Sequence, residues 1–283
     1  MSGVDPSAAV AKQTKLAAEI FDELYNKTFD GVGVTRASYG EGEQVASELL
    51  ESHAKKLGLV IDHDAAGNIY MTMRGESQEA PPIVIGSHRD SVAQGGNFDG
   101  AAGVISGLIA CASIIEKGIR LPQDIRVMGI RAEESAWFGV SYIGSRSALG
   151  TLPKDALDNA KRSDTGITLG EHMLKAGCNP DALRAGDIYL PPSSLKAYLE
   201  VHIEQGPVLD SKDLPLGIVT GIRGNRRLPS ARCIGEYSHC GGVPRSYRKD
   251  AVLAVTDLVN YLDRIWDDCE NEGKDFAFTV GKF

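Results

Sequence analysis

The sequence has few cysteines, and their spacing builds neither a cross-link nor a metal-binding knuckle. Five occur in 283 residues, an odd number without a Cys-x-x-Cys pair: Cys111, Cys178, Cys233, Cys240 and Cys269. This spacing argues against a disulfide framework and against a structural zinc site. Because disulfides persist in oxidising compartments, we expect a reducing, cytoplasmic location.

Positive charge and long apolar runs are also scarce. Lys and Arg number 30 against 38 Asp and Glu, a net charge of −8, so the basic surplus typical of nucleic-acid-binding proteins is absent. No apolar run approaches the roughly 20 residues of a membrane helix. Residues 1–13 lack a basic region followed by an apolar core, so we expect no signal peptide. These observations exclude nucleic acid and membrane as expected partners.

The residues that are present are typical of a globular protein with a sheet and helices. Apolar residues make up 42% and charged residues 24%, which suits a packed core in one large or two medium domains. Helical spacing of apolar residues occurs in segments 7–27, 43–57 and 103–117. Short apolar runs typical of strands occur at 59–61, 68–73, 83–85, 124–130 and 195–203. This alternation predicts an α/β fold with a mixed, mostly parallel sheet flanked by helices.

The pattern changes near residue 212, where we place a domain boundary between 1–212 and 213–283. Segments 216–223 and 227–236 suggest a hairpin around Gly224-Asn225, segment 247–269 a long helix, and segment 276–280 a further strand. We therefore expect a second, incomplete α+β domain.

Polar residues capable of chemistry follow the apolar strand 83–85. The loop after it carries His88, Asp90 and Asp99, and ligands of open α/β sheets collect at the carboxyl ends of strands. Two more polar groups follow predicted strands in the same way, Glu133-Glu134 and the segment 202–205 (His-Ile-Glu-Gln).

Imidazole and carboxylate ligands together suit zinc and its neighbours in the first transition row. Two histidines and two carboxylates can hold two metal ions if one carboxylate bridges them, and such a pair lowers the pKa of a shared water. A further carboxylate must then move the proton, and Glu133 and Glu134 could divide these tasks. Asp90, two residues after His88, is placed to orient the imidazole.

Four segments resemble the hydantoinase/carbamoylase family of amidases, which includes N-carbamoyl-L-amino-acid hydrolases, allantoate amidohydrolases and β-ureidopropionases. They are GSHRDSVAQGGNFDGAAG (86–103), RAEES (131–135), EVHIEQGPVL (200–209) and GEYSHCGGVPRSYRKDA (235–251). The resemblance implies a zinc-exopeptidase-like catalytic domain over 1–212 and part of a lid and dimerisation domain over 213–283. It further implies a homodimer formed through the second domain.

The resemblance also implies the role of each site residue. Two divalent metal ions per subunit, zinc or manganese with cobalt or nickel as alternatives, would be held by His88, Asp99, Glu134 and His202. His88 and His202 would bind the first ion, Glu134 the second, and Asp99 both. Glu133 would be the general base and acid, and Asp90 would orient His88. Gln205 would contact the substrate, and His239, commonly from the neighbouring subunit, would hold the substrate and its oxyanion.

The sequence departs from the family pattern at Arg89, at Trp137 and in the run 240–245, all of which concern the pocket lining rather than the metal ligands. Family members also continue beyond the equivalent of residue 283. That continuation supplies a further His ligand and the Asn and Arg that bind the substrate carboxylate, so we expect a chain truncated at its C-terminus.

The first functional hypothesis is a metal-dependent hydrolase of the carbamoyl C–N bond of N-carbamoyl-L-amino acids or related ureido acids, releasing ammonia and carbon dioxide. The partner would be a small ureido acid. An aminoacylase or dipeptidase of the same metallopeptidase clan is the second hypothesis, and a truncated, non-catalytic remnant is the third. A cysteine hydrolase using Cys240 beside His239 is the fourth. The remaining histidines, His53, His63 and His172, are expected to be solvated.

Overall fold

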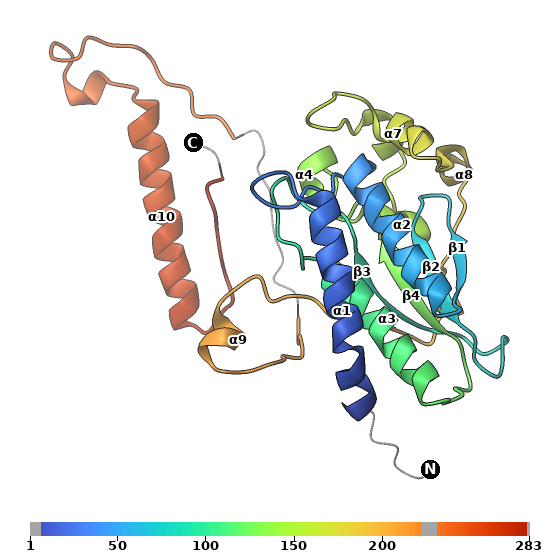
Figure 1. The fold of residues 1–283 in the computed structure, drawn as a ribbon. Coiled ribbons are helices and arrows are strands. Elements are labelled where there is room, and N and C mark those ends of the chain that lie inside the picture. Colours follow the sequence, from blue (N-terminus) through green and yellow to red (C-terminus); the bar gives the residue numbers. More distant parts are fainter. Residues whose placement is uncertain (1–6, 222–230, 282–283) are drawn as a thin grey trace. The chain divides into compact units, whose positions relative to one another are not determined.

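The computed structural model describes residues 7–221 and 231–281 (Figure 1). The chain divides into two compact units, residues 1–206 and residues 207–283, close to the predicted boundary at 212. Within the described ranges, no helix combines the length and the apolar character needed to cross a membrane.

One five-stranded sheet forms the centre of the first unit. Its strands are β1 (Val60–His63), β2 (Ile69–Met73), β3 (Ile83–His88), β4 (Ile125–Ile130) and β5 (Ala197–Leu199), in the order β1-β2-β4-β3-β5. Strand β3 pairs in parallel with β4 and β5, whereas β2 pairs antiparallel with β1 and β4. The sheet is mixed, as predicted, but half of its pairings are antiparallel rather than most being parallel.

One of the two antiparallel pairings, that of β1 with β2, has a local cause in the turn between these strands. The Asp64 carboxylate accepts hydrogen bonds from the backbone N–H groups of Ala66 and Asn68, both at 3.0 Å. These bonds close a tight turn, and strands joined by a tight turn pair antiparallel because a parallel pair needs a long crossover.

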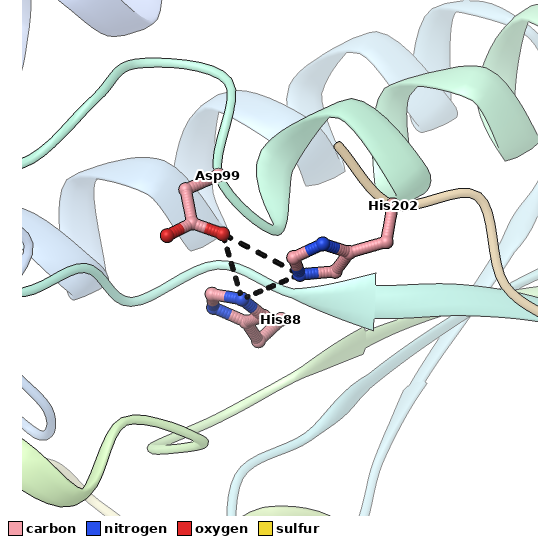
Figure 2. Close-up of side chains that lie close together, drawn as sticks. All are labelled: His88, Asp99 and His202. Carbon is pink, nitrogen blue, oxygen red and sulfur yellow. Dashed lines mark hydrogen bonds and ion pairs between the residues drawn. The ribbon is translucent and has the colours of Figure 1, made fainter. Parts of the chain in front are cut away.

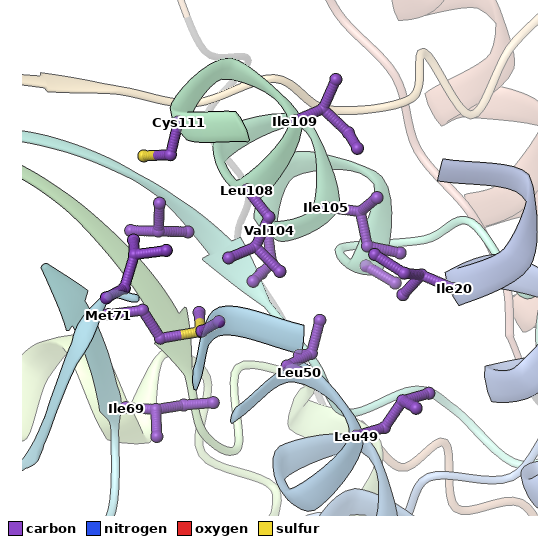
Figure 3. Close-up of a cluster of buried hydrophobic side chains, with 14 of the residues drawn as sticks. Ile20, Leu49, Leu50, Ile69, Met71, Val104, Ile105, Leu108, Ile109 and Cys111 are labelled. Carbon is purple, nitrogen blue, oxygen red and sulfur yellow. The ribbon is translucent and has the colours of Figure 1, made fainter. Parts of the chain in front are cut away.

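Three long helices cover one face of the sheet: α1 (Ser7–Thr28), α2 (Glu41–Lys56) and α3 (Ala101–Glu116). Their apolar residues form the main core with alternate residues of the strands (Figure 3). Ile69, Met71 and Val127 face this core, while Tyr70 and Met128 face a smaller cluster on the opposite side of the sheet. This alternation is the two-residue period of a strand that is buried on both faces.

Short helices follow β4 in sequence, and several of them build a third apolar cluster that includes Trp137 and Phe138. They are α4 (Ser135–Phe138), α5 (Ile143–Ala148), α6 (Ala156–Asn159), α7 (Leu169–Lys175) and α8 (Pro180–Arg184), with a 3₁₀ turn at Pro192–Ser194. Helix α7 begins with a capping box, in which Thr168 and Glu171 each bind the other's backbone N–H.

The second unit contains α9 (Val208–Ser211), a 3₁₀ turn (Arg245–Tyr247) and the long helix α10 (Ala251–Asn271), which confirms the predicted helix. Part of the predicted hairpin lies outside the described residues. Its described flanks, 216–221 and 231–236, form no strand, and neither does 276–280. None of the residues described after 206 is buried, so a second α+β domain is not evident in this structure.

Candidate metal centre

Three of the four predicted metal ligands, His88, Asp99 and His202, converge at one edge of the sheet in the first unit. Strands β3, β4 and β5 run in parallel, so their carboxyl ends lie together. His88 is the last residue of β3, His202 follows β5, and Asp99 lies just before the first turn of α3. The sheet topology thus brings together residues that are up to 114 positions apart in sequence.

Three ligand atoms of these residues form a nearly equilateral triangle (Figure 2). His88 Nε2 lies 3.5 Å from Asp99 Oδ1, His202 Nε2 lies 3.4 Å from the same oxygen, and the two Nε2 atoms are 3.4 Å apart. Ligands about 2.0–2.1 Å from a tetrahedral zinc ion lie roughly 3.3–3.4 Å from one another. Asp99 Oδ1 is buried and has no hydrogen-bond partner among the described residues. This geometry fits a metal ion coordinated by His88, Asp99 and His202.

The backbone at Gly100 allows this approach. Its φ is +64°, a conformation that favours glycine, and a Cβ atom placed there would lie 2.5 Å from atoms of the His88 ring. Any larger residue would push the imidazole away from Asp99.

Asp90 orients the imidazole and favours positive charge beside it. His88 Nδ1 lies 3.0 Å from the Asp90 carbonyl oxygen and 3.5 Å from the Asp90 carboxylate. Nδ1–H therefore donates to the carbonyl oxygen, and the other ring nitrogen, Nε2, faces Asp99 and His202. Burial lowers the pKa of His88, but the contacts with the Asp90 and Asp99 carboxylates and their negative charge outweigh it and raise that pKa to about 11. Carboxylates that favour a proton so strongly also favour a metal cation at this point.

The same Asp90 carboxylate fixes the glutamate pair. It is fully buried and accepts hydrogen bonds from the Glu133 N–H at 3.0 Å, the Glu134 N–H at 3.1 Å and the Ser38 hydroxyl at 2.7 Å. Burial raises the pKa of Asp90, and the His88 contact and the other hydrogen bonds lower it further than burial raises it. Asp90 is therefore an ionised link between the His88 imidazole and the backbone of the glutamate pair.

Both glutamate side chains lie near His88 and form a second cluster with it. His88, Glu133 and Glu134 can each offer a ligand atom within 4.8 Å of the others. Burial raises the pKa of Glu133, and it raises the pKa of Glu134 to about 7. The division of roles, with Glu134 as metal ligand and Glu133 as proton carrier, stays a prediction.

The two predicted substrate-binding residues lie in different units. Gln205 donates from Nε2 to Asp99 Oδ2 at 2.7 Å, so in this structure it contacts a predicted metal ligand. His239 lies in the second unit, where its Nδ1 accepts hydrogen bonds from the N–H groups of Gly241 and Gly242 at 3.2 and 2.8 Å. Their roles toward a substrate stay predictions.

Sequence reasoning missed two buried charged residues that support the centre. Arg36 donates from Nε to the Arg89 carbonyl oxygen at 2.8 Å and from Nη2 to the Asp99 carbonyl oxygen at 3.2 Å. Glu43 accepts from the Tyr39 N–H, from Arg131 Nε and from the N–H of residue 132, at 2.7, 2.7 and 2.8 Å. From the sequence alone both side chains would be expected to be solvated, because no local pattern indicates that they are buried.

Two histidines outside the centre also differ from expectation. His53 and His172 are buried, with 5% and 6% of their surfaces exposed, whereas His63 is half-exposed and pairs with Glu51 at 2.8 Å. His172 lies 2.9 Å from the Thr165 hydroxyl and packs edge-on against Phe138. The predicted solvation of His53 and His172 was therefore wrong.

The sequence and the fold of this chain are similar to those of known hydrolases. The family model of Peptidase family M28 matches residues 68–168. The chain is 38% identical to an N-carbamoyl-L-amino acid amidohydrolase of Geobacillus stearothermophilus, over 88% of this chain and 58% of that protein. It is 30% identical to a ureidoglycolate hydrolase of Arabidopsis thaliana, over 88% of this chain and 52% of the relative.

Solved structures agree with these relatives. The crystal structure of a hydantoinase/carbamoylase family amidase from Burkholderia ambifaria aligns with a TM-score of 0.70 and 30% identity, covering 88% of this chain and 60% of that one. This chain thus spans less than two thirds of the length of each of these proteins.

Proposed function

Because the chain belongs to the hydantoinase/carbamoylase family of amidases, we propose that it is a metal-dependent hydrolase of the carbamoyl C–N bond of ureido acids. Its substrates would be N-carbamoyl-L-amino acids or a related ureido acid such as allantoate or ureidoglycolate. The observation that supports the proposal most is the triangle of His88, Asp99 and His202 beside two partly buried glutamates.

The donor set fits divalent zinc or manganese, with cobalt or nickel as alternatives. His88, Asp99 and His202 would hold one ion, and Asp99 with Glu134 a second. When bound, such ions polarise a carbonyl group and lower the pKa of a coordinated water.

Glu133 would move the proton. Its backbone N–H is bound to Asp90, and one of its carboxyl oxygens lies within 4.8 Å of a ring nitrogen of His88. A carboxylate in this position takes the proton from water and delivers it to the departing nitrogen, which leaves as ammonia. The carbamate that remains then loses carbon dioxide.

The test is turnover of a panel of N-carbamoyl-L-amino acids, allantoate and ureidoglycolate, measured as ammonia release by the 283-residue chain. We expect turnover that stops with a chelator and returns with zinc or manganese. Glu133→Gln should lower kcat about 1,000-fold while the metal content, measured by mass spectrometry, stays that of the wild type. Glu79→Gln, at an exposed loop position, is the control and should leave kcat unchanged.

Equal kcat in Glu133→Gln and wild type would remove the proposed role of Glu133. A chain that binds metal but turns over none of these compounds would favour a non-catalytic remnant, and ammonia release that resists chelators would exclude metal dependence.

A second candidate function, an aminoacylase or dipeptidase, is favoured by the match of residues 68–168 to Peptidase family M28. Peptide and N-acyl substrates release a free amine and a carboxylate instead of ammonia. Adding N-acetyl amino acids and dipeptides to the panel therefore separates the two functions by their products.

The setting of the enzyme is also proposed. We expect a cytoplasmic homodimer, with the second unit carrying the subunit contact and His239 serving the neighbouring subunit. Sedimentation of the purified chain tests whether it is a dimer. A His239→Asn variant assayed for KM and kcat tests the role of His239.

A further inference from the structure

Arg36 has no surface exposure, although it lies in the loop that joins α1 to α2. Its backbone is fixed from both sides, because its N–H donates to the Ser91 hydroxyl and its carbonyl oxygen accepts from the Ser91 N–H, both at 2.9 Å. A guanidinium held in this way is a rigid donor whose N–H groups point in set directions.

The two carbonyl oxygens that Arg36 binds lie in the two segments that carry metal ligands. The Arg89 carbonyl directly follows His88 at the end of β3, and the other carbonyl is that of Asp99 itself. Between these two carbonyls the chain forms an irregular loop without a helix or an extended strand. One planar side chain therefore joins both ends of a loop that, among the described residues, pairs with other backbone as a β-bridge at Gly95 alone.

We propose that Arg36 is a positioning residue for the metal centre. By binding the carbonyl groups of Arg89 and Asp99 at once, it sets the separation between His88 Nε2 and Asp99 Oδ1, which is 3.5 Å. The inference rests on the proposed metal binding, because without a metal the separation of these atoms has no consequence.

A second buried arginine provides a matched control. The Arg89 side chain is 1% exposed and donates to the carbonyl oxygens of Gly129 and Gly67. Each arginine binds two carbonyl groups and leaves one buried nitrogen unpartnered among the described residues, Nη1 of Arg36 and Nε of Arg89. The carbonyl groups bound by the Arg89 side chain belong to Gly129 in β4 and to Gly67 before β2, and neither lies in the segments that carry His88, Asp99 and His202. The structure encloses Arg89 in the interior, whereas the sequence suggested a position in the pocket lining.

The experiment compares the full chain with Arg36→Met, Arg36→Lys and Arg89→Met. The dissociation constant for Co²⁺ is measured by competition with a chromophoric chelator, and the visible absorption of the bound Co²⁺ reports its coordination geometry. The melting temperature of each metal-free protein measures the general loss of stability.

We expect Arg36→Met to weaken Co²⁺ binding 10- to 100-fold and to change the Co²⁺ spectrum, as is usual when a group that orients metal ligands is lost. Arg36→Lys should recover part of the affinity, because an ammonium can bind one of the two carbonyl groups. Arg89→Met should lower the melting temperature about as much as Arg36→Met does, but the spectrum of its bound Co²⁺ should be that of the wild type.

Wild-type affinity and spectrum in Arg36→Met would overturn the inference. So would equal changes in Arg36→Met and Arg89→Met, since both effects would then follow from the loss of stability. If Arg36→Met does not fold, Arg36→Lys decides, and wild-type Co²⁺ binding in that variant overturns the inference. A wild-type chain that binds no metal would instead refute the proposed function on which the inference rests.

Discussion

The two units of the chain differ in how far their charged and apolar side chains are buried. The first unit buries charge at its centre, where Glu43 and Arg131 pair at 2.7 Å with 0% and 4% of their side-chain surfaces exposed. The ion pair of Glu236 and Lys249 in the second unit is about two-thirds exposed on both sides. Of these two described pairs, the one in the first unit therefore lies in the low-dielectric surroundings in which charge and geometry are tightly coupled.

Apolar residues show the same difference. The main core of the first unit gathers residues from three helices and the sheet, whereas Val252, Leu253, Leu258 and Tyr261 of α10 are all more than half exposed. Helix α10 is nevertheless regular, because the Asp250 carboxylate caps its first N–H groups. Local signals can thus specify a helix, but a site that holds ligand atoms within a few tenths of an ångström needs a packed core beneath it.

The largest effect on the free energy of unfolding is expected when the buried ion pair of Glu43 and Arg131 is broken. Glu43→Gln leaves the Arg131 guanidinium buried without its counter-charge, so we expect the free energy of unfolding to fall by about 3–5 kcal/mol. The matched change Glu236→Gln, at the exposed pair, should cause no measurable loss. Urea unfolding of both variants measures the difference, and equal losses would contradict the contrast between the two units.

A pair of leucines in two helices tests the cores directly. Leu108 in α3 is fully buried, and Leu258 in α10 is 55% exposed. Leu108→Ala should reduce the free energy of unfolding by about 3 kcal/mol, since it leaves a cavity, whereas Leu258→Ala should change it by less than about 1 kcal/mol. Because both positions are within helices, the gain in helix propensity is the same in each variant. A large loss in Leu258→Ala would show that α10 packs against a partner in solution.

Two glycines with nearly the same positive φ differ in what a side chain at each position would meet. Gly100 has φ +64° beside the His88 ring, and Gly273 has φ +68° with nothing within 4 Å of the point that a methyl group would occupy. Both alanine variants carry the strain of a positive φ, and the ψ of −49° at Gly100 lies outside the left-handed helical region, which adds to the cost there. Gly100→Ala should be about 2 kcal/mol less stable than Gly273→Ala and should also lose metal affinity. Equal stability and unchanged metal binding would show that the His88 ring moves freely.

Much of the first unit could be predicted from the sequence, because its signals are local. The periodicity of apolar residues gave helices within a few residues of α1, α2 and α3, and the polar groups at strand ends indicated His88, Asp99 and His202. The parallel pairing of β3 with its two neighbours then explains why these residues meet. The predicted strands of the second unit were wrong where the structure describes them, since a strand needs a partner that a short apolar run does not specify.

The supporting residues of the centre could not be predicted, because their partners are distant in sequence. Arg36 binds carbonyl groups 53 and 63 positions away, and Glu43 binds groups of the β4 end 88 and 89 positions away. A charged residue reads as solvated unless its partner is known, and the same reasoning failed for the buried His53. Only tertiary packing decides which charges a fold encloses.

The smallest expected effect concerns acid stability and the imidazole of His53 in α2. Burial, with the nearby Lys56, lowers the pKa of His53, although Glu23 and Glu19 oppose this. As the pH falls through about 6.5, the unfolded chain takes up a proton that the folded chain resists, so the free energy of unfolding falls with decreasing pH. Between pH 7.5 and 5.5 we expect His53→Gln to remove part of this decrease, less than the limit of about 1.4 kcal/mol for one proton that only the unfolded chain takes up. Urea unfolding at both pH values measures it, and an unchanged pH dependence in His53→Gln would mean that the imidazole is protonated as readily in the folded chain as in the unfolded one.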